Sequence, residues 1–100
     1  NIQTILIRSP QDKSYDGFKN ENDLNKVLKD AFSDVFFIDL VNFPLNEDEY
    51  RDPEHVNEKG SEKISIWLNS LIQNNISNIF INKNHLNYQD IEDIIQKRKT

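Results

Sequence analysis

The stretch VFFIDL, residues 35–40, decides the fold because β-branched and aromatic residues make up most of it. An apolar run of this length is typical of a strand that is covered on both faces, as in a parallel sheet. We interpret two other short runs in the same way: IQTILIR at residues 2–8, which ends at Ser9-Pro10, and ISNIFI at residues 76–81. The sequence therefore predicts three buried strands.

The first two helices are predicted from apolar residues at helical spacing between these strands. Asn22 or Asp23 is expected to cap the first helix, and Asn57 is expected to cap the second. Gly60 falls on the buried side of the second helix, which indicates close packing of helix against strand. The predicted buried stripes are Leu24, Val27, Leu28, Ala31 and Phe32 in the first helix, and Ile64, Trp67, Leu68, Leu71 and Ile72 in the second.

A last helix is predicted after Asn87, with Ile94 and Ile95 on its apolar face. Leu86 and Ile91 occupy the positions of a hydrophobic staple around its start. Strands and helices then alternate as β-α-β-α-β-α, which predicts a single α/β domain over residues 1–100 with a short parallel sheet flanked by helices.

Composition excludes several kinds of partner and site. The chain of 100 residues carries a net charge of -5 and shows no basic stripe, so we do not expect it to bind nucleic acid or an anionic membrane surface. No apolar run approaches the roughly 20 residues of a membrane span. The absence of cysteine excludes disulfides, thiolate zinc sites and a cysteine nucleophile. We predict no cofactor and no metal.

The segment YRDPEHVNEKG, residues 50–60, carries the candidate chemistry. It belongs to a predicted loop, residues 41–56, that follows the second strand, and parallel sheets bind ligands beyond the carboxyl ends of their strands. Asp52 and His55 are three residues apart across Pro53, so the turn brings the carboxylate back toward the ring. A carboxylate on one ring nitrogen fixes the tautomer and leaves the other nitrogen free to take a proton. The alternative is a plain Asp-Pro turn that leads into a helix capped by Asn57.

The longer segment YRDPEHVNEKGSEKISIWLNSLI, residues 50–72, resembles the last conserved block of the SGNH/GDSL family of serine esterases and O-acyltransferases. That block carries Asp-x-x-His, an aliphatic residue, Asn, and Gly three residues later, at the start of the C-terminal helix. Asp52, His55, Val56, Asn57 and Gly60 match it. The pattern is most similar to extracytoplasmic members linked to polysaccharide or cell-envelope acylation, which would place the protein outside the cytoplasm or at the cell envelope.

The resemblance implies a division of roles and a partial, flavodoxin-like or SGNH-like domain. His55 would be the general base and Asp52 its orienting acid, acting on an acyl ester or a polysaccharide. The family's Gly-Asp-Ser nucleophile block does not occur in this sequence. Residues 1–75 therefore resemble the C-terminal part of an SGNH domain, with residues 76–100 as an additional strand-helix unit. We expect the serine to come from an upstream part of the same polypeptide, and the isolated chain to be inactive.

Other side chains are weaker candidates for the same site. Ser9 follows the first strand but lacks a helix N-terminus that could supply oxyanion donors, and Ser61 is expected to lie on the surface. The acidic run at residues 46–52 lacks the ligand pattern of a calcium loop. His85 is interpreted as a loop histidine without a carboxylate partner. Four aromatic residues flank the predicted edge and either line an acyl or sugar pocket or pack onto the core: Tyr15, Phe18, Phe43 and Tyr50.

A second hypothesis belongs to a different class, namely a non-catalytic α/β module for binding or assembly. A truncated sheet exposes an unpaired edge strand and apolar surface. Such a module is expected to form a homodimer through the exposed sheet edge.

Overall fold

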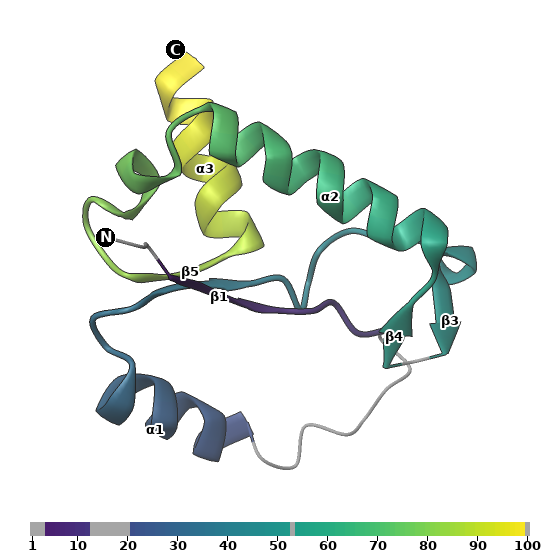
Figure 1. Cartoon of the computed structure of the whole chain (residues 1–100), viewed down its shortest axis with the longest axis horizontal. Helices are drawn as coiled ribbons and strands as arrows, with labels where there is room; N and C mark the ends of the chain where they lie inside the picture. Colours follow the sequence, from purple (N-terminus) through teal and green to yellow (C-terminus); the bar gives the residue numbers. More distant parts are fainter. Residues whose placement is uncertain (1–3, 13–20, 53, 100) are drawn as a thin grey trace.

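A three-stranded parallel sheet runs through the middle of the molecule (Figure 1). The computed structural model of the chain describes residues 4–12, 21–52 and 54–99. The strands are β1 (Ile5–Arg8), β2 (Phe36–Asp39) and β5 (His85–Asn87), in the order β1-β2-β5. The central strand pairs Phe36 with Ile5 of β1 and Ile38 with Leu86 of β5. The predicted α/β class and short parallel sheet are confirmed.

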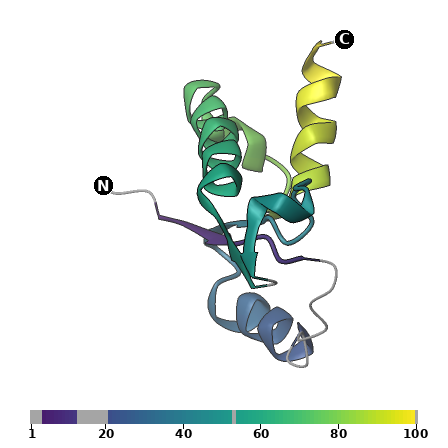
Figure 2. The same cartoon turned by 90° about the vertical axis from the view of Figure 1, so that its right-hand side faces the viewer.

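Helices cover both faces of this sheet. Figures 1 and 2 show α1 (Glu21–Ala31) on one face, and α2 (Glu58–Gln73) with α3 (Tyr88–Lys99) on the other. Side chains alternate along each strand, and residues paired between parallel strands point to the same face. Ile38 and Leu86 therefore face α2 and α3, whereas Phe37 faces α1.

The main core lies between the sheet and the α2–α3 layer. Its buried members are Ile38, Leu40, Phe43, Leu71, Ile79, Phe80, Leu86 and Ile91. Phe36 stacks on Phe80 with ring centroids 4.3 Å apart. Phe43 and Tyr88 pack edge to face, and Trp67 donates its indole N–H to Glu92 at 3.0 Å, which joins α2 to α3. The predicted stripe of α2 contributes Leu71 as its most buried member, whereas Ile72, which was predicted in the same stripe, is exposed.

The α1 face has a thinner core and is held by charge. Arg8 donates to both carboxylate oxygens of Glu21, at 2.8 and 2.7 Å, and to Asp39 at 3.3 Å. A two-point Arg–carboxylate contact of this kind is strong and directional, and it lowers the pKa of Glu21. Among the described residues of α1, only Leu28 is buried.

Two details of the first helix were predicted wrongly. The described helix already begins at Glu21, so Asn22 and Asp23 lie in its first turn and do not precede it. Val27 and Phe32, expected in the buried stripe, remain exposed. The described sheet has three short strands, so it is too narrow to cover the whole apolar side of α1. Gly17, which the sequence marks as a turn point between the first strand and the first helix, lies outside the described residues.

The third predicted strand, residues 76–81, is wrong. Residues Ile76–Phe80 form a short 3-10 helix, η2, after Asn75 takes a left-handed backbone conformation with φ of 61°. The side chains of Ile79 and Phe80, which belong to this turn, are buried. They follow Ile76 by three and four positions, a spacing that suits a helical turn better than a strand. The third strand is instead β5, which begins at His85; this residue was predicted to lie in a loop.

Both helix caps on the α2–α3 face are confirmed. Asn57 accepts a hydrogen bond from the Gly60 amide at 3.1 Å at the start of α2. At the start of α3, Asn87 Oδ1 accepts from the Asp90 amide at 2.8 Å, and Asp90 Oδ2 accepts from the Asn87 amide at 3.0 Å. Leu86 and Ile91, the predicted staple, are both buried in the core.

Candidate functional site

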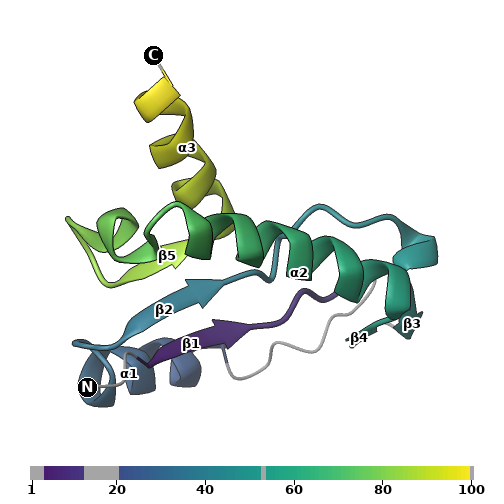
Figure 3. The same ribbon diagram turned by 45° about the horizontal axis from the view of Figure 1, so that its top comes forward.

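The candidate site lies in a small hairpin beyond the carboxyl ends of β1 and β2 (Figure 3). The hairpin consists of β3 (Tyr50–Asp52) and β4 (His55–Val56), and it follows the short 3-10 helix η1 (Glu47–Glu49). Its antiparallel register places Asp52 opposite His55. The predicted loop at residues 41–56 therefore contains regular structure, and its position at the strand ends is the expected one.

Asp52 and His55 are in direct contact. His55 Nδ1 lies 2.9 Å from Asp52 Oδ1 and 3.1 Å from Oδ2. Because a carboxylate can only accept hydrogen bonds, the proton of the neutral ring is assigned to Nδ1, which leaves Nε2 as the proton acceptor. The side chains of His55 and Asp52 are 57% and 44% exposed. Pro53, which follows Asp52 in the sequence, lies outside the described residues.

Three neighbouring groups stabilise the negative charge of Asp52. The hydrogen bond with His55, and then the bond of 2.9 Å from the Glu54 amide, lower the pKa of Asp52. Arg51 Nε also lies 3.8 Å from Asp52 Oδ2. The carboxylate is thus ionised at neutral pH and able to orient the imidazole.

Asn57 links the hairpin to the start of α2. Besides capping α2, its side-chain amide donates to the Asp48 carbonyl at 2.6 Å. Its backbone amide donates to the Glu49 carbonyl at 2.9 Å. Asn57 therefore fixes η1, the hairpin and the first turn of α2 relative to one another, and this fixes the backbone that carries His55.

Glu49 is the residue of this site that sequence reasoning missed. It is only 4% exposed, although it belongs to the acidic run at residues 46–52, which the sequence marks as polar. Its carboxylate accepts from the Asn46 amide at 2.6 Å and from Lys63 Nζ at 2.8 Å. These two bonds, in that order, lower the pKa of Glu49. The Asn-x-x-Glu spacing of Asn46 and Glu49 is the local signal of such a cap.

Gly60 allows the close packing of α2 that is predicted from its place on the buried side of the helix. A Cβ atom at this residue would lie 2.5 Å from the Glu49 carbonyl oxygen and 3.0 Å from Val56 Cβ. The absence of a side chain at Gly60 therefore lets α2 approach η1 and β4 closely.

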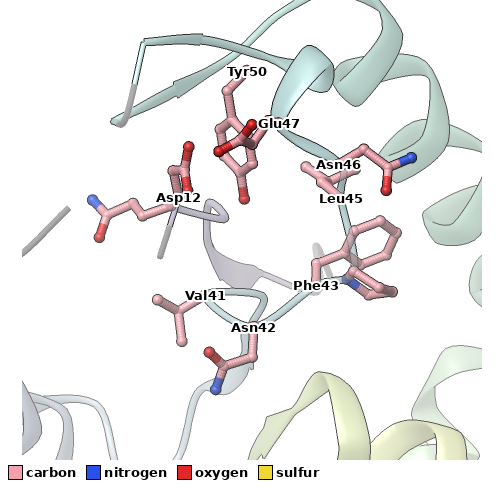
Figure 4. Close-up of a pocket in the computed structure, with 10 residues that line it drawn as sticks. Asp12, Val41, Asn42, Phe43, Leu45, Asn46, Glu47 and Tyr50 are labelled. Atoms are coloured by element: carbon pink, nitrogen blue, oxygen red, sulfur yellow. The ribbon is translucent and has the colours of Figure 1, made fainter. Parts of the chain in front are cut away.

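An open pocket of about 810 Å³ lies beside the hairpin (Figure 4). Tyr50 points into it from β3, and Val41 and Asn42 lie across from it. Burial, and then the negative charges of Asp12 and Glu49, raise the pKa of Tyr50. Asp52 and His55 are not among the residues that line this pocket. The lining residues are Gln11, Asp12, Val41, Asn42, Phe43, Pro44, Leu45, Asn46, Glu47 and Tyr50.

Of the four predicted aromatic residues, Phe43 and Tyr50 line the pocket, and Phe43 also packs into the core. Tyr15 and Phe18 lie outside the described residues. The pocket mixes apolar surface with amide and carboxylate groups.

The two candidate serines, Ser9 and Ser61, are not hydrogen-bonded to His55. Within residues 4–12, 21–52 and 54–99, Ser9 and Ser61 are exposed, and no hydroxyl is hydrogen-bonded to His55. The second histidine, His85, binds the Phe32 carbonyl at 2.8 Å through Nε2 and packs edge to face on Phe37. His85 is therefore part of the scaffold between β5 and the segment after α1.

Three further findings concern metals, membranes and relatives. No three His, Asp or Glu side chains of the described residues are grouped so that they could hold a metal ion. None of the helices in the described part of the chain is long and apolar enough to cross a membrane. Comparison with family models, curated proteins and solved structures finds no match to this chain.

Replacing His55 by alanine is expected to raise the pKa of Asp52 toward its ordinary value of 3.8. The recovery should be partial, because the Glu54 amide still donates to the carboxylate. Folding lowers the pKa of Asp52, so its contact with His55 stabilises the folded state fully at pH values above the unfolded pKa. This stabilisation is lost as the pH falls through the lowered pKa of the folded state. Carboxyl carbon NMR titration measures the shift, with His85→Ala as the control. An unchanged Asp52 titration in His55→Ala would show that the two groups do not interact in solution.

Proposed function

We propose that this chain supplies the Asp-His half of the catalytic site of an SGNH-type serine esterase or O-acyltransferase. The observation that carries the proposal is the contact of 2.9 Å between His55 Nδ1 and Asp52 Oδ1. It leaves Nε2 as the proton acceptor on a hairpin beyond the carboxyl ends of β1 and β2, where ligands of parallel sheets bind. The resemblance of residues 50–72 to the family's Asp-x-x-His block supports the same assignment.

In the proposed reaction, His55 Nε2 removes the proton of a serine hydroxyl as its oxygen attacks the ester carbonyl. Asp52 stabilises the imidazolium that forms. The tetrahedral intermediate collapses to an acyl-enzyme when the leaving alcohol takes the proton back from Nε2. Water or an acceptor hydroxyl, deprotonated in turn by His55, then attacks the acyl-enzyme. The serine oxygen leaves and takes the proton back from Nε2, which releases the acid or the transferred ester.

The serine of this reaction is proposed to lie in another part of the polypeptide, because these 100 residues contain no Gly-Asp-Ser block and no described serine is hydrogen-bonded to His55. Glu49, Asn57 and Gly60 would act as positioning residues that hold the hairpin against α2. The substrate is proposed to be an acyl ester, with a polysaccharide hydroxyl as one class of acceptor. An extracytoplasmic or cell-envelope location follows from the same resemblance.

A fluorophosphonate probe, which reacts covalently with activated serines, tests the proposal on the polypeptide as its gene encodes it. Labelling is expected in the natural protein. Because a general base accelerates such a step by about 100-fold or more, the labelling rate should fall by at least that factor in His55→Ala. His85→Gln, which changes the other histidine of these 100 residues, should label at the natural rate.

Mass spectrometry of the labelled protein identifies the serine. No labelling of the natural protein, or equal labelling in His55→Ala, would overturn the proposal. The isolated segment of 100 residues should neither label nor hydrolyse p-nitrophenyl acetate. Ester turnover by the isolated segment that His55→Ala abolishes would show that the nucleophile lies within it.

A further inference from the structure

Strand β1 has a neighbour on one side only among the described residues, because the sheet order is β1-β2-β5. The Arg8 carbonyl accepts a hydrogen bond of 3.0 Å from the Leu40 amide, so the backbone groups of Arg8 point toward β2. Backbone groups alternate in direction along a strand. Those of Leu6 therefore also point toward β2, and those of Ile5 and Ile7 point outward from the sheet.

The side chain of Ile7 is partly exposed at this same edge of the sheet. Ile7 pairs with Ile38 across the sheet, and both side chains face α2 and α3. Ile38 is 0% exposed, whereas Ile7 is 46% exposed. The difference arises because Ile38 has a strand on each side and Ile7 has only one. The edge thus combines two outward amides, two outward carbonyls and an exposed aliphatic side chain, which together form a template for strand pairing.

We propose that this edge pairs with β1 of a second copy of the chain, in an antiparallel arrangement about a two-fold axis at Leu6. In this register Ile5 of each copy lies opposite Ile7 of the other. Both residues direct their amide and carbonyl groups outward, so each opposed pair forms two hydrogen bonds, and all four outward groups of each strand are satisfied. The result is a continuous sheet of six strands, β5-β2-β1-β1-β2-β5.

The register is self-complementary, as a two-fold interface requires. The isoleucines of the two copies meet on one face of the sheet and bury the exposed part of Ile7. The two Leu6 residues meet on the other face as a pair without mutual hydrogen bonds. Arg8 does not oppose another cation across the axis, and its charge is already matched by Glu21 and Asp39 of its own chain. The pairing is proposed for the chain of residues 1–100 by itself, and a strand from an upstream part of the same polypeptide is the competing occupant of this edge.

A disulfide at the axis tests the register. In an antiparallel pair without mutual hydrogen bonds, opposed Cα atoms lie about 4.5 Å apart, which is within the range of about 4.4–6.8 Å that a disulfide spans. The chain contains no cysteine, so there is no competing thiol. In a glutathione redox buffer, Leu6→Cys should form a covalent dimer at least 10-fold faster than Ile66→Cys, whose site is exposed on α2. Equal rates would overturn the register.

Sedimentation equilibrium tests the interface without relying on the cysteine variant. The natural chain should show a monomer–dimer equilibrium at micromolar concentrations. Ile7→Lys should be monomeric, because it places a charge in the apolar centre of the interface, whereas Ile66→Lys should dimerise like the natural chain. A natural chain that stays monomeric at 1 mM, or an Ile7→Lys variant that dimerises normally, would overturn the proposal.

Discussion

Replacing Gly60 by alanine should destabilise the fold by about 2 kcal/mol and lower the melting temperature by roughly 8–16 °C. The new Cβ would lie 2.5 Å from the Glu49 carbonyl oxygen, so α2 or η1 must move. That oxygen belongs to the backbone and accepts the Asn57 amide at 2.9 Å. The Glu49 side chain is held by Lys63. Overpacking costs about 1–3 kcal/mol, and a clash of 2.5 Å with a backbone atom belongs at the upper end of that range. The better helix propensity of alanine returns at most about 1 kcal/mol, which leaves about 2 kcal/mol.

Urea unfolding, followed by circular dichroism, measures this loss. Ser61→Ala is the matched control, because the same final residue is placed one position along the helix at an exposed site, where changes stay within about 0.5 kcal/mol. In the encoded polypeptide, Gly60→Ala should also slow labelling by the fluorophosphonate probe, since the displaced hairpin carries His55. A Gly60→Ala chain as stable as the natural one would show that α2 and η1 separate without cost.

The parts of the fold that were predictable have local signals. Strand β2 follows from a run of apolar residues, and α2 follows from a cap at Asn57 and a stripe that continues to Leu71. The third strand has no such signal, because Leu86 is its only buried residue and the strand is three residues long. It forms because the backbone of β2 needs a partner on that side, as the bond from the Phe37 amide to the Asn84 carbonyl shows.

The side-chain contacts at the candidate site and at the strand ends also divide into those with a local sequence signal and those without one. The contact between Asp52 and His55 follows from their spacing across a turn, so the sequence was sufficient to predict it. The pairing of Glu49 with Lys63 joins residues that are 14 positions apart, and that of Arg8 with Asp39 joins residues 31 apart. Such contacts depend on how the elements pack. Charged residues of this kind therefore appear in the sequence as ordinary surface residues.

Replacing Ile38 by alanine is expected to destabilise the fold by about 3 kcal/mol, within the range of about 2–5 kcal/mol for such core truncations. Ile38 is fully buried at the centre of the middle strand, between Ile7 of β1 and Leu86 of β5. Strands fix its backbone on both sides, and α2 and α3 cover its face of the sheet. The surroundings can therefore collapse only a little into the cavity, and the lost contacts are not replaced.

The corresponding fall in melting temperature is roughly 12–24 °C. Calorimetry measures it, and Ile66→Ala is the control, because the same atoms are removed from a side chain that is 64% exposed. The control should stay within about 0.5 kcal/mol of the natural chain. Because Ile38 faces the only extended core of the described residues, its loss should unfold the sheet and the hairpin together. Equal melting temperatures for Ile38→Ala and Ile66→Ala would mean that the α2–α3 layer does not pack on the sheet in this way.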